Sequence, residues 1–417
     1  MMEYNPHRYF SPRRILFHPA VFCEEDEVKR ICQRIFLHQV QTASNKVVIF
    51  LLNISDTFAR SMKLSSLTVF VLLATIFSGC KQDFDITADY KEIPVVYGLL
   101  NQQDNVHYIR IQKGFLIDGN ALVAAGVADS VYYPDVLTVK LIPYYNGSPN
   151  GSAFTLTRVD GNTQAPPVTK DSGTFANSPN ILYRFTGTLD PTKSYRLEVT
   201  NTTNGNFIKT KKNEDGLEIT LVKDFNISAP HTADKIKLQN TSPSKVVWNG
   251  AENAGIYDLT VRFNYKEYRT SDNVLLRDTF IDILFFKSIA YDYNGGGSLP
   301  PFEITADNVL TFLKNHLTAT NDVYREFNAT KGMDFKLAAG GTELTKFMNS
   351  QQAQGGLASN EALPPYTNID GGVGLLSSRY FKEVDGVLLS NNALDTLACS
   401  ELSRNLRFKN HNGVVCP

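Results

Sequence analysis

The sequence predicts a mainly β fold with two β-sandwich units and a small α+β portion at the C-terminus. Short apolar segments alternate with clusters of Gly, Asn, Asp and Pro over residues 92–225, a spacing typical of strands and turns in a sandwich. A second stretch, which begins near Ala229, alternates strictly between apolar and polar residues after Trp248, the only tryptophan. No long helical pattern interrupts residues 93–222, so the first unit is predicted to be all-β.

The longest apolar stretch lies ahead of these units. Met62-Lys63 precedes fourteen uncharged residues, Leu64 to Phe77, and Ser78-Gly79-Cys80 follows. A helix of that length rises about 21 Å, which is too short for a hydrocarbon core of about 30 Å. A basic start, an apolar region and small residues are the parts of a secretory signal. Because Phe77-Ser78-Gly79-Cys80 resembles a lipobox, we expect cleavage before Cys80 and its lipidation; the alternative is a buried segment with a chance cysteine.

Signal peptides act from the N-terminus, but this one begins 61 residues into the chain. We therefore expect residues 1–61 to be a mis-annotated extension and residues 62–79 to be the signal peptide. Residues 80–91 would then be the lipidated cysteine and a short polar tether. The alternative is a genuine cytoplasmic extension, which would turn the apolar run into a short membrane anchor.

The first unit, residues 92–225, opens with a predicted hairpin. Ile93 to Leu100 is apolar, Asn101 to Asn105 is a polar turn, and Val106 to Ile111 has period-two alternation. Further strands are predicted between turn clusters, at Val136–Ile142, Phe154–Arg158, Ile181–Phe185, Tyr195–Val199, Phe207–Lys211 and Leu217–Val222. Many short strands at this spacing predict a β-sandwich.

The second unit, residues 229–300, is predicted to be a sandwich of its own. Trp248 ends an apolar segment, and the chain from Tyr257 to Tyr265 then alternates apolar and polar residues. This element resembles the opening of a fibronectin type III domain, in which a tryptophan on one strand packs under the other sheet. The resemblance implies an immunoglobulin-like or fibronectin III-like unit with Trp248 in its core. The strand from Thr279 to Phe286 is expected to continue it.

The last third, residues 301–417, is predicted to be an α+β portion that completes the second domain. Thr305 is expected to cap a helix whose apolar residues recur at helical spacing. The remaining predictions are a strand at Met333–Ala339, a short helix at Glu343–Gln352, a loop at 353–372, strands at Val373–Tyr380 and Val387–Leu389, and a helical turn at Leu394–Leu397. Cys399 and Cys416 are expected to form a disulfide, because an oxidising compartment favours bridged cysteines.

Several of these segments together resemble a family of Bacteroidota outer-membrane lipoproteins of unknown function. They are the lipobox, the segment from Ile93 to Leu100, the element from Trp248 to Tyr257, and the Gly-rich stretch from Thr367 to Arg379. The resemblance covers roughly residues 80–400. It implies a lipid-anchored protein of the outer membrane, on its periplasmic or cell-surface side, beside a TonB-dependent outer-membrane transporter. It supplies no catalytic residue.

Charge and motifs argue against several function classes. The 41 basic and 42 acidic residues create no strong field for nucleic acid. The sequence has no H-E-x-x-H, G-x-S-x-G, Walker or G-x-G-x-x-G motif, and His107, His231, His316 and His411 are far apart along the chain. We therefore expect no metal or cofactor and predict a non-enzymatic binding or accessory module. The alternatives are a glycan or peptide hydrolase with an unrecognised acid pair and a structural assembly lipoprotein.

Tyrosines beside turns are the one indication of a ligand site. The weak candidates are Tyr132, Tyr133, Tyr144, Tyr145, Tyr291 and Tyr293. Exposed rings at the end of a sandwich would stack on a glycan or contact a peptide or protein partner. The alternative is that one ring of each pair is buried and the other covers a sheet edge.

We predict that Cys80→Ala abolishes membrane association, because Cys80 is the expected attachment site of the acyl chains. Metabolic labelling with a radioactive fatty acid should mark the wild-type protein and leave the variant unlabelled. Equal incorporation into both proteins would show that the lipobox interpretation is wrong.

Overall fold

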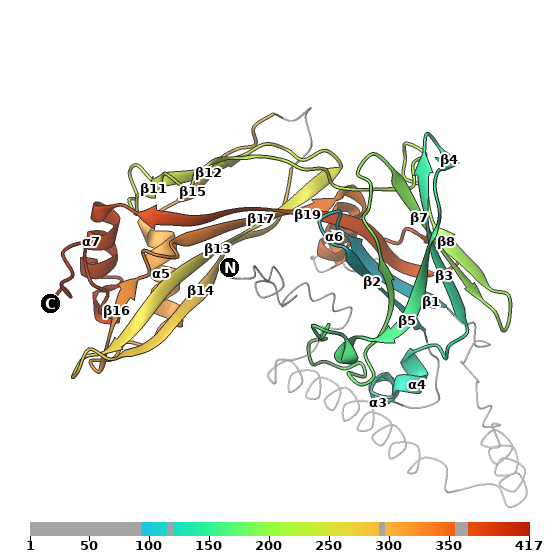
Figure 1. Cartoon of the computed structure of the whole chain (residues 1–417), viewed down its shortest axis with the longest axis horizontal. Helices are drawn as coiled ribbons and strands as arrows, with labels where there is room; N and C mark the ends of the chain where they lie inside the picture. Colours follow the sequence, from blue (N-terminus) through green and yellow to red (C-terminus); the bar gives the residue numbers. More distant parts are fainter. Residues whose placement is uncertain (1–92, 115–119, 292–296, 355–365) are drawn as a thin grey trace, which may run out of the picture. The chain divides into compact units, whose positions relative to one another are not determined.

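The computed structural model describes residues 93–114, 120–291, 297–354 and 366–417 (Figure 1). It has 45% strand and 15% helix, so the predicted mainly β fold is confirmed. Residues from Lys91 to Pro417 form one compact unit. The predictions for residues 1–61, for the signal peptide at 62–79, and for Cys80 and its tether lie outside the described residues.

Ten strands and the first part of a shared strand, β19 (Val373–Leu389), form the first sandwich, and every strand predicted there is present. The order of the longer strands is β1 (Pro94–Leu100), β2 (Val106–Lys113), β6 (Ile181–Thr186), β5 (Phe154–Asp160), β3 (Leu137–Tyr145), β7 (Ser194–Asn201), β8 (Phe207–Thr210) and β18 (Ile369–Asp370). Two-residue strands β4 (Ser148–Pro149) and β9 (Ile219–Thr220) pair with β3 and β7. Alternate residues point inward and form one hydrophobic cluster that includes Val96, Ile109, Leu141, Tyr183 and Leu197.

Two short helices that the sequence did not predict follow β2. They are α3 (Ala121–Ala125), whose first turn is capped by the Asn120 side chain, and α4 (Ala128–Val131). At five and four residues they are too short to show a helical period. They lead into Tyr132, which belongs to a small separate cluster with Val131, Ala176 and Ile181.

The second sandwich has two sheets around the larger hydrophobic cluster. One sheet contains β10 (Ile227–Ala229), β12 (Ser244–Trp248) and β15 (Phe302–Ile304); the other contains β14 (Leu275–Ala290), β13 (Ala254–Arg269), β17 (Met333–Gly341) and β19 (Val373–Leu389), in these orders. When these seven strands are numbered in chain order, the first, second and fifth form one sheet, and the third, fourth, sixth and seventh form the other. This arrangement is that of an immunoglobulin-type sandwich. Trp248 and Tyr257 are each 1% exposed with ring centroids 6.2 Å apart, so the predicted core role of Trp248 is confirmed.

Short strands and three helices complete this unit. They are β11 (Lys235–Ile236), β16 (Val323–Phe327), α5 (Ala306–His316), α6 (Thr342–Gln354), α7 (Asn391–Cys399) and the 3-10 turn η3 (Arg404–Leu406). Another 3-10 turn, η2 (Gly161–Thr163), belongs to the first sandwich. Thr305 caps α5 as predicted, because its side chain accepts a hydrogen bond from the Asn308 amide. Cys399 and Cys416 form a disulfide with Cα atoms 5.2 Å apart, which joins the end of α7 to the C-terminal segment.

Strand β19 belongs to both sandwiches. Its first residues, Val373–Ser378, pair in parallel with β1, and Arg379–Val387 pair antiparallel with β17. The sequence predicted two separate strands here, at Val373–Tyr380 and Val387–Leu389. That prediction is wrong: Glu383 lies on the outer face and forms an ion pair with Lys336 on β17, so the charge does not interrupt the strand.

Gly374 lets β1 and β19 approach each other. Its φ of +115° is in the left-handed region, and an added Cβ would overlap the carbonyl oxygen of Val96. We predict that Gly374→Ala lowers the free energy of unfolding by about 3 kcal/mol or more, from backbone strain plus displacement of β1.

The matched control is Gly147→Ala. Gly147 also has a positive φ, +76°, but an added Cβ meets no described atom within 4 Å. The Gly147→Ala substitution should therefore lower the free energy of unfolding by only about 1 kcal/mol. Urea denaturation followed by circular dichroism measures both losses, and equal losses would contradict the close approach at Gly374.

Candidate binding surface

Three of the six tyrosines singled out from the sequence are buried. Tyr132, Tyr133 and Tyr144 are 3%, 4% and 6% exposed, so the expectation that they are exposed loop aromatics is wrong. Tyr132 and Tyr133 are consecutive but pack into two different hydrophobic clusters. The centre of the Tyr144 ring lies 4.4 Å from the central carbon of the Arg196 guanidinium. The next residue, Tyr145, is half exposed, because successive side chains of a strand point to opposite faces.

The remaining pair gives no aromatic platform either. Tyr291 packs against the large cluster, with its ring centroid 6.1 Å from that of Trp248. Tyr293 lies outside the described residues. Tyr145 is therefore the one candidate of the six that the structure shows with a substantially exposed ring.

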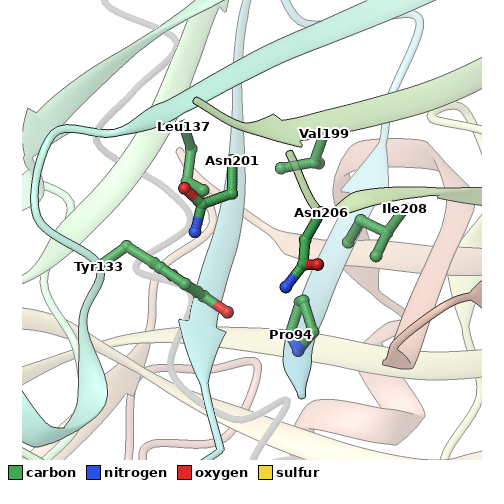
Figure 2. A pocket seen from close by; sticks show the side chains of 7 residues that line it. All are labelled: Pro94, Tyr133, Leu137, Val199, Asn201, Asn206 and Ile208. Carbon is green, nitrogen blue, oxygen red and sulfur yellow. The ribbon is translucent and has the colours of Figure 1, made fainter. Parts of the chain in front are cut away.

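A small pocket opens at one end of the first sandwich (Figure 2). Its cavity volume is about 10 Å³, and its lining is Pro94, Tyr133, Leu137, Val199, Asn201, Asn206 and Ile208. Figure 2 shows the Tyr133 hydroxyl and the Asn206 amide directed into the same space. Ligand pockets usually measure about 300–1,000 Å³, and this lining holds no carboxylate. The pocket therefore offers no acid pair for glycoside or peptide hydrolysis.

The histidines have local partners. His107 stacks on Phe185, and burial lowers the pKa of its imidazole. His316 bonds the Phe312 carbonyl of its own helix, and His411 Nδ1 lies 2.6 Å from an Asp395 carboxylate oxygen. In the ranges that the structure describes, no three His, Cys, Asp or Glu side chains gather as a metal site would require.

The most unusual surface is the outer edge of β14. This sixteen-residue strand pairs with β13 along one edge, and no strand within the described residues pairs with its other edge. Exposed large apolar side chains gather along it and the preceding turn: Val274, Leu275, Leu276, Phe280 and Leu284, at 40–50% exposure. Long apolar edges are rare, because their unpaired backbone groups attract further strands.

The register with β13 explains which side chains are exposed. Phe280 and Leu284 lie opposite Asn264 and Thr260, on the outer face of the sheet. Ile283 lies opposite Val261 and is 2% exposed, because it faces the core. The hairpin turn between the two strands places Asn273 at φ +57°, a conformation that asparagine tolerates well.

Ion pairs neutralise Asp278 and Asp282 on this edge. Arg262 binds both carboxylate oxygens of Asp282, at 2.8 and 2.9 Å, and its guanidinium lies 3.6 Å from the centre of the Phe280 ring. Lys331 Nζ lies 2.8 Å from Asp278. The charges next to Phe280 are thus already paired, whereas Lys287 is exposed farther along the same strand; Phe280 covers Arg262, which is 5% exposed.

Farther from the edge, the outer face continues as a polar strip. Lys336 is 6% exposed and pairs with Glu383 at 3.2 Å. Desolvation raises the pKa of the Asp385 carboxyl, and the nearby carboxylates of Asp334 and Glu383 raise it further. The surface therefore combines an apolar edge with a mixed-charge face.

The sequence carried a signal for this edge. The stretch from Phe280 to Phe286 is apolar except for Asp282, so both faces of the strand are apolar. A strand with one solvated face needs apolar residues on one side alone. The second apolar face indicated an additional contact, but the sequence did not show that β14 is an edge strand.

We predict that Leu284→Lys changes the free energy of unfolding by less than about 1 kcal/mol, because this side chain is half exposed. Ile283→Lys on the same strand is the matched control and should cost more than about 3 kcal/mol, since it places a charge in the core. Urea denaturation of both variants tests the assignment. Similar losses would mean that the two side chains do not face opposite sides.

The chain matches no protein-family model, and no curated protein is significantly similar to it.

Proposed function

We propose that this chain is a lipid-anchored protein of the cell envelope that acts as a non-enzymatic binding module. In this proposal, the open edge of β14 binds an extended segment of a partner protein as an added strand. The observation that carries the proposal is a sixteen-residue edge with exposed apolar side chains and with Asp278 and Asp282 held in ion pairs. Strand addition supplies affinity through backbone hydrogen bonds and specificity through alternate side chains.

The anchor part rests on the segment from Met62 to Cys80, with its basic start, apolar region and lipobox. Among the residues that the structure describes, no helix is long and apolar enough to span a bilayer. A lipid on Cys80 would supply the membrane attachment, and the resemblance to Bacteroidota lipoproteins suggests an outer-membrane transporter as the partner.

The chemistry of the β14 edge limits which segment would fit. Phe280 and Leu284 are four residues apart on one face, so they would lie opposite two residues that are also four apart on an added strand. Between them, Asp282 is held by Arg262 and is 41% exposed. The best partner is therefore an extended segment with small or apolar side chains opposite the two apolar residues and a hydrogen-bond donor between them.

The test is photo-cross-linking in intact cells, with benzoylphenylalanine in place of Phe280. We expect one discrete adduct, and we expect the added variant Leu284→Lys to reduce it at least about tenfold, because an unpaired lysine opposes strand addition. The control position is Leu217, which is 41% exposed and lies in the first sandwich. An equal yield at Leu217, or an adduct that is insensitive to Leu284→Lys, would rule out β14 as the binding edge.

A further inference from the structure

A second group of exposed apolar side chains lies at one end of the first sandwich. Six of the fourteen exposed large hydrophobic side chains among the described residues belong to it: Ile93, Leu122, Val123, Val127, Phe207 and Val373, at 37–67% exposure. None of them is on β14. We call this surface the tether end, because the described chain begins there at Ile93.

Strand register brings these segments together. Pro94 pairs with Lys113 and Val95 with Val373, so the start of β1, the end of β2 and the start of β19 coincide. Phe207 pairs with Thr200 near the end of β7, and Leu137 pairs with Asn201 at the same end. The Gly371 backbone approaches Ile208, which places β19 beside β8. The pocket of Figure 2 opens at this end too.

The segment that contains α3 follows the end of β2 along the chain, and the Arg110 guanidinium of β2 donates a hydrogen bond to the hydroxyl of Tyr132, directly after α4. Asn120 to Ala128 is nine residues without a charge. Leu122 and Val123 are 64% and 67% exposed, whereas Ala124 and Ala125 on the other side of the helix are buried. The Ala125 carbonyl accepts a hydrogen bond from the Ala176 amide, which fixes the buried side of α3 to the neighbouring loop. The apolar side chains are therefore held outward by a fixed backbone.

We propose that the tether end docks on the lipid bilayer that holds the acyl chains of Cys80. This inference rests on the proposed anchor, and the structure adds where the anchored protein meets the membrane. Twelve residues separate Cys80 from Ile93, so the extended tether reaches at most about 45 Å. The chain thus reaches the folded part at the end that carries the exposed apolar side chains.

A bilayer fits this surface for physical reasons. Uncharged apolar side chains on a short helix enter the boundary between headgroups and acyl chains to a depth of about 5–10 Å. The tether keeps the surface near the membrane, so even a weak apolar interaction becomes intramolecular and effective. Docking by this end would hold the first sandwich in one orientation on the membrane, while leaving the β14 edge of the second sandwich to bind its partner.

The experiment uses the acylated protein, purified from membranes and reconstituted in phosphatidylethanolamine–phosphatidylglycerol vesicles. The processed protein lacks Cys23 and Cys32 together with residues 1–79. With Cys80 acylated and Cys399 bridged to Cys416, Val123→Cys then introduces the one free thiol for an environment-sensitive fluorophore. The matched control is Leu217→Cys. Leu217 is two residues before Ile219, which pairs with Tyr195 at the end of β7 that is opposite to the tether end. Intact mass confirms acylation of each sample.

We expect the label at position 123 to shift to shorter wavelength, and nitroxide on the acyl chains to quench it roughly twofold or more. The label at position 217 should stay in water. An acylated protein whose two labels behave alike would overturn the docking and leave the anchor standing. Protection of position 123 in native membranes but not in lipid vesicles would assign the surface to a protein partner and also overturn it. Protein without acyl chains would overturn the anchor, and the docking with it.

Discussion

The continuous pairing of β19 is the constraint on which the rest of the structure depends. One strand, Val373–Leu389, supplies a parallel neighbour to β1 and an antiparallel neighbour to β17. Both hydrophobic clusters therefore include side chains of the same strand, Leu376 in the first and Val387 in the second. A change that displaces β19 would loosen both cores, which is why the close approach at Gly374 matters beyond its own neighbourhood.

Side chains that bond to backbone reinforce this joint. The Gln103 amide both donates to the Phe381 carbonyl and accepts from the Phe381 amide, at 2.9 Å each, so the β1–β2 turn is bound to β19. Ser378 accepts from the Val222 amide and donates to the Thr220 carbonyl, at 3.0 and 2.8 Å. The segment that leads from the first sandwich to the second, around Thr220 and Val222, is thus held to β19 by hydrogen bonds of Ser378. Buried polar groups stabilise a fold when each has its hydrogen-bond partner.

Most large apolar side chains of the sandwiches are buried, and eleven of the fourteen exposed ones among the described residues lie at two places. At the β14 edge the exposed side chains accompany unpaired backbone, which favours an added strand. At the tether end the backbone around α3 is already bonded, and the exposed side chains are uncharged, which favours lipid. Both surfaces are apolar, and they differ in whether their backbone N–H and C=O groups already have hydrogen-bond partners. This difference is the basis of the two separate proposed roles.

Sequence alone determined the local elements. Alternation from Tyr257 to Tyr265 and the cap at Thr305 are local signals, so the strand and the helix appeared where predicted. The core position of Trp248 also followed, because a large ring between apolar residues is usually buried. Tertiary structure decided the rest: that β19 is one strand, that Tyr133 and Tyr144 face inward, and that β14 is an edge. Which strands are neighbours depends on contacts between residues far apart in the chain, and a one-residue change of register would reverse every exposed side chain.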